Sequence, residues 1–207
     1  MDYALLLSLA GFAFVMSITP GPNNLMLMSS SALFGVRATL PHWFGINIGF
    51  NILLIAAVFG LGELVVRYPW SLWLVKIGGA AWLVWMAWIF VKAGLAPPTA
   101  NGEAPAAQTR SRPFRIYEAA LFQWINPKAL MMTISAAGAY IALADQPAER
   151  AALMVLTFVL FGAPCGLAWT LAGGAIHRFM KDPAWSRRLN FVIAGLLVVT
   201  IGLVVTG

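Results

Sequence analysis

The chain has 207 residues, of which 61% are hydrophobic and only 10% are charged, with a formal net charge of +6. Soluble domains carry about 25% charged residues, so this composition excludes a soluble globular domain. The single cysteine, Cys165, also excludes an internal disulfide and a dithiol redox pair. Several apolar runs exceed the roughly 18 residues typical of a membrane-spanning helix, and we therefore predict an all-α polytopic membrane protein.

Six membrane spans are predicted, at about Ala4–Phe34, His42–Gly62, Trp70–Lys92, Ile116–Leu143, Ala151–Ile176 and Leu189–Val205. The segment between the third and fourth spans is rich in Pro, Ala, Gly and Thr and has no periodic apolar face, which predicts a flexible linker. The predicted organisation is thus a three-helix repeat (residues 1–93), a cytoplasmic linker (94–115) and a second, inverted three-helix repeat (116–207).

The first predicted span contains a polar stretch, SITPGPNN, at residues 17–24. Proline lacks an N–H, clashes with the preceding turn and pushes the residue before it out of helical geometry. Pro20, Gly21 and Pro22 together therefore predict a break, after which the helix restarts with proline at its first position. The alternative is a simple kink whose freed backbone groups are satisfied by neighbouring helices.

A matching interruption, INPKALMM at residues 125–132, lies in the fourth predicted span. Aligning Pro22 with Pro127 also pairs a leucine and a methionine, and FGINIG of the second span matches FGAPCG of the fifth at the same spacing. The third and sixth spans share only a basic residue followed by glycine. Because each half has an odd number of spans, the halves are predicted to be inverted. Inverted repeats with interrupted helices mark the binding sites of secondary transporters.

Each restarted helix begins with unpaired N–H groups and about half a positive charge, which favours carboxylate binding. In an inverted arrangement the helix starts at Pro22 and Pro127 face each other near the bilayer midplane. Lys128 adds a full charge there, at an insertion cost of about 2.5–3.5 kcal/mol. No Asp or Glu is placed deep in a span to pair with it. The hypothesis is that the missing anion is the carboxylate of the substrate.

Asn47 and Asn51 are one helical turn apart on the second span and share a face. Their amides could join helices or contact substrate, and Gln123 presents the same choice. No catalytic set, cofactor site or metal site is predicted, because His and Cys do not cluster and no carboxylate lies deep within a span. The candidate substrate-binding residues are Pro20, Gly21, Pro22, Asn23, Asn24, Asn47, Asn51, Gln123, Asn126, Pro127 and Lys128.

Basic residues collect on one side of the predicted membrane, which is the cytoplasmic side by the positive-inside rule. That side carries nine of them: Arg37, Lys92, Arg110, Arg112, Arg115, Arg178, Lys181, Arg187 and Arg188. The other side has Arg67 and Arg150, with Lys76 nearby. With six spans, both termini are predicted on the outer face. The net charge is explained by topology, without a nucleic-acid partner.

The motifs ITPGPNN and QWINPKA, with a glycine-rich second helix, resemble the LysE/RhtB family of amino-acid exporters over essentially the whole chain. TPGPNN with SS shortly after, and RRLNFVIAGLLV, are most similar to the branch that exports cysteine and O-acetylserine. The resemblance implies a multi-pass protein of the bacterial inner membrane, energised by an ion gradient. It also implies functional roles for residues 20–24 and 126–128.

The leading functional prediction is secondary active export of a small neutral amino acid or derivative. A strongly cationic substrate would need an acidic partner, and none is placed in the predicted core. A membrane enzyme is not predicted, since the thiol, aspartate and serine–histidine sets it would need are missing from the spans. A passive channel or structural subunit is the alternative. The expected partners are the substrate and the lipid bilayer, and a homo-oligomer is compatible with the sequence.

Overall fold

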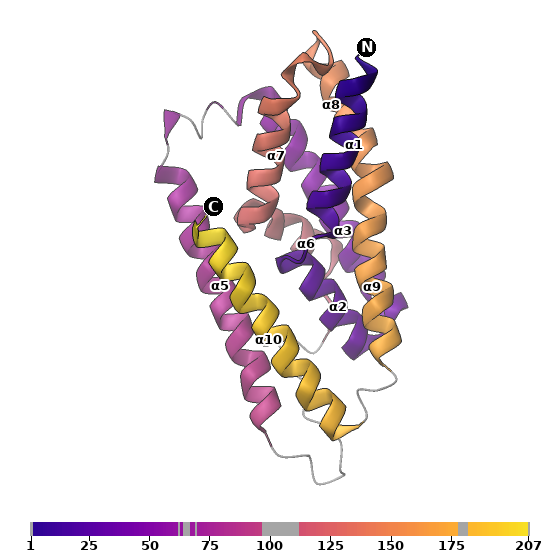
Figure 1. The fold of residues 1–207 in the computed structure, drawn as a ribbon, viewed down its shortest axis with the longest axis vertical. Coiled ribbons are helices and arrows are strands. Elements are labelled where there is room, and N and C mark those ends of the chain that lie inside the picture. Colours follow the sequence, from indigo (N-terminus) through magenta and orange to yellow (C-terminus); the bar gives the residue numbers. More distant parts are fainter. Residues whose placement is uncertain are drawn as a thin grey trace.

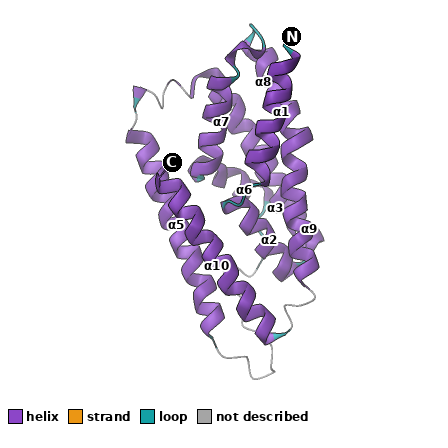
Figure 2. Cartoon of the chain, in the orientation of Figure 1, coloured by secondary structure: helices purple, strands orange, loops and turns teal. Residues whose placement is uncertain are grey.

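The computed structural model describes residues 2–61, 63, 67–68, 70–96, 112–177 and 182–206. Every regular element in these ranges is helical, as Figure 2 shows. The first half contains α1 (Tyr3–Ile18), α2 (Pro22–Phe34), α3 (Val36–Ala56), the wide turn η1 (Ala57–Leu61) and α5 (Trp70–Leu95). The second half contains α6 (Ile116–Phe122), η2 (Gln123–Ile125), α7 (Pro127–Ala139), η3 (Ile141–Leu143), α8 (Pro147–Thr157), η4 (Phe158–Gly162), α9 (Ala163–His177) and α10 (Pro183–Thr206).

The described helices include four that are long and apolar enough to cross a membrane: Val36–Leu61, Trp73–Leu95, Pro147–Ile176 and Ala184–Gly202. The pair α1 and α2, bent by 51° at a short break, would form a fifth span. The fourth predicted span is divided among α6, η2 and α7, and none of these is long enough alone. The helical membrane class is therefore confirmed, whereas the six spans and the inverted 3+3 repeat stay predictions.

The two halves pack against each other rather than forming separate bodies. Helix α2 lies along α9, and α3 lies along α6, while α5 and α10 form a long pair at one side of the molecule (Figure 1). One apolar core joins α2, α5 and α10 around Met26, Leu83 and Leu197. A second joins α1, α7 and α8 around Leu9, Met132 and Met154. The first residues of α1 and the last of α10 both lie in the upper half of Figure 1.

The helix ends differ from the predicted spans at several points. Helix α3 begins at Val36 instead of His42, because Gly35 alone connects it to α2 with a φ of +84°, which favours glycine. The fifth span runs through Pro164 without a break, since the wide turn η4 directly precedes α9. Helix α10 begins at Pro183, six residues before the predicted start. Most of the predicted linker, residues 97–111, lies outside the described residues.

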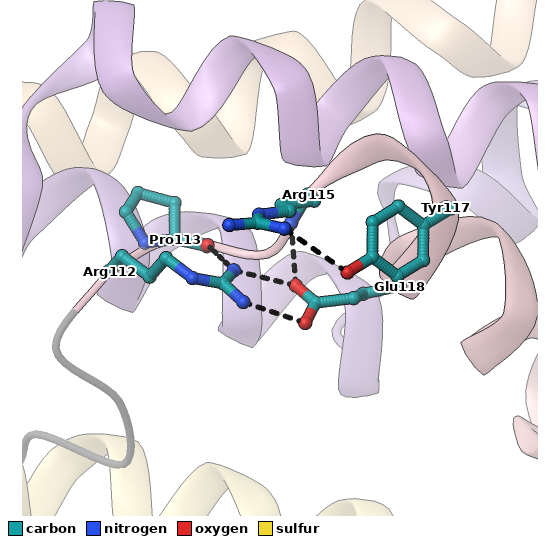
Figure 3. A network of polar contacts seen from close by, with 5 residues as sticks. All are labelled: Arg112, Pro113, Arg115, Tyr117 and Glu118. Carbon is teal, nitrogen blue, oxygen red and sulfur yellow. Dashed lines mark hydrogen bonds and ion pairs between the residues drawn. The ribbon is translucent and has the colours of Figure 1, made fainter.

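The start of α6 is fixed by a polar network (Figure 3). Arg112 donates two hydrogen bonds to the Glu118 carboxylate at 2.7 and 2.9 Å, and the Arg115 backbone N–H donates to it at 2.8 Å. Glu118 therefore caps its own helix, as an acidic residue at the third helical position can.

Close helix packing between α3 and α6 requires glycine, which generates a stability prediction. A Cβ added at Gly49 would come within 2.5 Å of the Ala120 backbone. Gly49→Leu is therefore expected to reduce the free energy of unfolding by about 1–3 kcal/mol. Thermal unfolding in detergent can be followed with a thiol-reactive dye, because Cys165 is buried and is the only cysteine in the sequence.

The matched control is Gly78→Leu, since a Cβ at Gly78 meets no described atom within 4 Å. Equal unfolding temperatures for the two variants would contradict the packing argument.

Candidate functional site

The first helix is broken where the sequence predicts. Helix α1 ends at Ile18, Thr19 and Gly21 are extended, and α2 restarts with Pro22 at its first position. No described side chain caps α2. Within the described residues, the backbone N–H groups of Asn23 and Asn24 also have no hydrogen-bond acceptor. The amino end of α2 is thus an uncapped, partially positive helix terminus.

The carboxyl end of α1 is, in contrast, well satisfied. The Asn24 side-chain amide donates to the Ser17 and Thr19 carbonyls at 2.8 and 2.9 Å. The Trp169 indole N–H of α9 donates to the Ile18 carbonyl at 3.1 Å. Side chains from α2 and α9 therefore replace the hydrogen bonds that the break removes, and they hold α1 in its bent position.

Lys128 completes this set of caps from α7. Its Nζ donates to the Thr19 carbonyl at 2.8 Å, to Thr19 Oγ1 at 2.9 Å and to the Pro20 carbonyl at 3.3 Å. The sequence hypothesis considered only acidic side chains as partners, and it therefore missed these carbonyl and hydroxyl oxygens. The break itself supplies the partners, because a helix carboxyl end presents free carbonyls and a partial negative charge. Lys128 forms no ion pair within the part of the chain that the structure describes.

The second predicted break is also present. The Asn126 backbone is extended, its Oδ1 accepts the Lys128 backbone N–H at 3.2 Å, and α7 restarts at Pro127. A Cβ at Gly79 of α5 would collide with the Pro127 ring, so this proline packs tightly against the third predicted span. The amino end of α7 is capped where that of α2 is not, and the two breaks are therefore chemically unequal.

A cavity lies between the two breaks, with about 70 Å³ open to the centres of water molecules. One water needs about 10–15 Å³ of such space, so the cavity holds several waters or one small organic molecule. Eight of the eleven predicted site residues line it: Gly21, Pro22, Asn23, Asn24, Asn47, Asn51, Asn126 and Lys128. Pro20, Gln123 and Pro127 do not.

Gln123 has a structural role next to the cavity. It is fully buried, exchanges hydrogen bonds with the Asn23 amide at 2.7 and 3.3 Å, and donates to the Ala119 carbonyl at 2.8 Å. Of the two alternatives, joining helices is the one this geometry supports, since the bond connects α2 to η2. Gln123 thereby positions Asn23 at the cavity wall.

Asn47 and Asn51 behave differently from Gln123. Their amides donate to carbonyls of their own helix, of Trp43 and Asn47 respectively, both at 2.8 Å. Neither amide bond joins α3 to another helix, and both side chains line the cavity. The Asn51 Oδ1 is buried without a partner among the described residues. Of the two alternatives, this geometry therefore favours contact with a substrate in the cavity over joining helices.

Sequence reasoning missed the aromatic and glycine walls of the cavity. Trp43, Phe50 and Phe158 line it, together with the glycine face of the fifth span, Gly162 and Gly166. The Trp43 indole donates to the Ala163 carbonyl at 3.0 Å and so connects α3 to α9. The matching FGINIG and FGAPCG motifs could have indicated this wall, because both motifs contribute residues to it.

Comparison with known proteins identifies one matching family and relatives along most of the chain. The LysE type translocator family matches residues 14–206, a range that includes both breaks. The cysteine/O-acetylserine efflux proteins of Escherichia coli (strain K12) and Shigella flexneri are each 26% identical over 187 residues, covering 90% of this chain and 90% of the relative. No solved structure matches the chain.

The cap on the Ile18 carbonyl generates a second stability prediction. Trp169→Phe keeps an aromatic ring but removes the N–H that the carbonyl accepts, and an unsatisfied buried group costs about 1–3 kcal/mol. A lower unfolding temperature is expected in the same thiol-dye measurement. Trp70→Phe is the control, because Trp70 is 61% exposed. An unchanged unfolding temperature for Trp169→Phe would show that this cap contributes nothing measurable.

Proposed function

This chain belongs to the LysE type translocator family, and on that premise we propose that it is a secondary active exporter of small neutral amino acids or their close derivatives. It acts from the bacterial inner membrane, with both termini on the outer face. The relatives named as cysteine/O-acetylserine efflux proteins support cysteine and O-acetylserine as first substrates to test.

The observation that carries this proposal is the uncapped amino end of α2 at the cavity wall. The free N–H groups of Asn23 and Asn24 and the helix dipole favour a carboxylate at this position. Interrupted helices whose amino ends point at the anionic group of a substrate are a recurring transporter design. The substrate carboxylate thus binds at the α2 terminus, near the predicted bilayer midplane.

The charges of the cavity support neutral substrates. Within the described residues, Lys128 is the one charged side chain that lines it, and no Asp or Glu does. A cationic side chain would add a further positive charge with no carboxylate to receive it, and unpaired charges in a membrane interior are costly. Small zwitterions, whose own carboxylate balances their ammonium, fit this environment best.

The arrangement of the cavity walls supports alternating access. Helices α2 and α3 from the first half and α7 and α9 from the second line the same cavity. Relative rocking of the two halves would therefore open it to one side and then to the other. A passive channel is the competing function, and it differs in a measurable way because a pore only equilibrates its solute.

A counterflow assay distinguishes a carrier from a passive channel. Proteoliposomes loaded with excess unlabelled L-cysteine under reducing conditions are expected to accumulate external labelled L-cysteine above equilibrium, since a carrier exchanges one molecule for another. Simple equilibration would indicate a channel, and no uptake would exclude L-cysteine as a substrate. The measurement needs no assumption about the coupling ion.

The position of the site is tested by Gly21→Leu in the same assay. A Cβ at Gly21 would meet the Lys128 side chain at 2.7 Å, so a larger side chain obstructs the cavity. Counterflow is expected to fall at least about tenfold, equivalent to about 1.4 kcal/mol of binding. Gly11→Leu on α1, where a Cβ meets no described atom within 4 Å, is expected to retain it. Equal rates for both variants would place the site elsewhere.

A further inference from the structure

The cavity between the two breaks has a polar end and an apolar end. At the polar end, Asn24, Asn126 and Lys128 belong to the breaks themselves. Gly162 lies at the same level, because a Cβ at Gly162 would come within 2.9 Å of Ser17 Oγ, near the end of α1. The amino end of α2, which is the proposed position of the substrate carboxylate, is also at this end.

The apolar end lies about one helical turn further along two of the lining elements. Met132 follows Lys128 by four residues on α7, a rise of about 6 Å. Phe158 precedes Gly162 by four residues in the wide turn η4. Phe50 of α3 joins them, and the ring centroids of Phe50 and Phe158 are 4.9 Å apart. The cavity is therefore lined at this end by a thioether and two phenyl rings.

Packing behind the cavity wall holds the apolar end in place. Met132 and Phe158 are 6% and 3% exposed and belong to the core around Leu9 and Met154. Phe12 of α1 packs on the Phe158 ring edge to face, with centroids 6.4 Å apart. The apolar wall is thus formed before any ligand binds, as is usual for sites that receive the apolar part of a small molecule.

We propose that Phe50, Met132 and Phe158 form the subsite for the substrate's side chain, and that this subsite selects neutral amino acids with apolar side chains, such as L-methionine and L-norleucine. The inference rests on the proposed export function and adds the class of side chain. With the carboxylate at the α2 terminus, an extended, unbranched side chain is long enough to reach the apolar end.

Polar side chains bind less well at this subsite for a physical reason. An oxygen that moves from water to phenyl and thioether groups loses hydrogen bonds that the wall does not replace. The amides of Asn47 and Asn51 already donate to carbonyls of α3, and the Asn51 Oδ1 is buried. Each methylene that leaves water at the subsite, in contrast, raises the affinity about fourfold.

O-acetyl-L-serine provides a sharp comparison, because two of the relatives are named for its efflux. Its side chain ends in an ester, whose oxygens accept hydrogen bonds and donate none. L-Homoleucine has a side chain of the same shape, with carbon in place of both oxygens. At a subsite of phenyl and thioether groups, L-homoleucine is therefore expected to bind more tightly.

The test measures how unlabelled amino acids displace labelled L-methionine from the purified protein in detergent. Across L-alanine, L-2-aminobutyrate, L-norvaline and L-norleucine, affinity is expected to rise about fourfold with each added methylene. L-Homoleucine is expected to bind at least about tenfold more tightly than O-acetyl-L-serine. Both comparisons use wild-type protein and depend on no variant.

Met132→Gln tests the position of the subsite. Glutamine is unbranched and similar in length to methionine, but it brings an amide to the apolar end, so L-norleucine is expected to bind about tenfold more weakly. L-Alanine, whose side chain is too short to reach Met132, should bind as it does to wild type. Met131→Gln is the matched control, because Met131 is the adjacent residue on α7 and does not line the cavity.

Phe50→Ala provides a second variant at a partly buried position. Loss of the ring removes apolar contact from the subsite, so the rise in affinity per methylene is expected to fall, again with little change for L-alanine. The dye assay on the buried Cys165 establishes that each variant is folded.

The inference is overturned if affinity does not rise across the series, if O-acetyl-L-serine binds as tightly as L-homoleucine, or if Met132→Gln leaves the norleucine-to-alanine ratio unchanged. It is also overturned if the protein carries out L-cysteine counterflow but does not bind L-methionine. Absence of counterflow with L-cysteine and with every amino acid of the series would instead contradict the proposed export function, so the two failures are distinguishable.

Discussion

The structure depends on how the backbone oxygens at the end of α1 are satisfied. Lipid offers no hydrogen-bond donors, so an interrupted helix persists in a membrane only where the protein itself caps the freed groups. Here Asn24, Lys128 and Trp169 donate to the carbonyls of residues 17–20. The alternative of a simple kink at Pro-Gly-Pro therefore accounts for the carbonyls at the end of α1, which neighbouring side chains satisfy. It does not account for the amino end of α2, whose N–H groups are left free.

These caps also tie the halves of the protein together at the site. Lys128 and Trp169 come from α7 and α9, whereas the carbonyls belong to α1, so the bonds cross from the second half to the first. Gln123 adds a further connection through Asn23. A rearrangement of the halves must therefore change the caps.

The sequence predicted the membrane class and both breaks, because Pro-Gly-Pro and Asn-Pro act on the local backbone. It also selected eight of the residues that line the cavity. It did not predict the partners of Lys128 or the role of Trp169, because a side chain that caps a carbonyl over 100 residues away leaves no periodic pattern.

The unequal capping of the two breaks explains why one of them suits a ligand. Asn126 already occupies the amino end of α7, so that terminus has less capacity for a carboxylate than the α2 terminus, which Gly21 cannot cap. At the α1–α2 break, a negative and a positive helix pole are adjacent without any acidic side chain. Within the described lining of the cavity, Lys128 is the one charged side chain beside these two opposite poles. The unequal capping follows from the residue before each proline: Gly21 leaves the first N–H groups of α2 free, whereas the Asn126 side chain accepts one of those of α7.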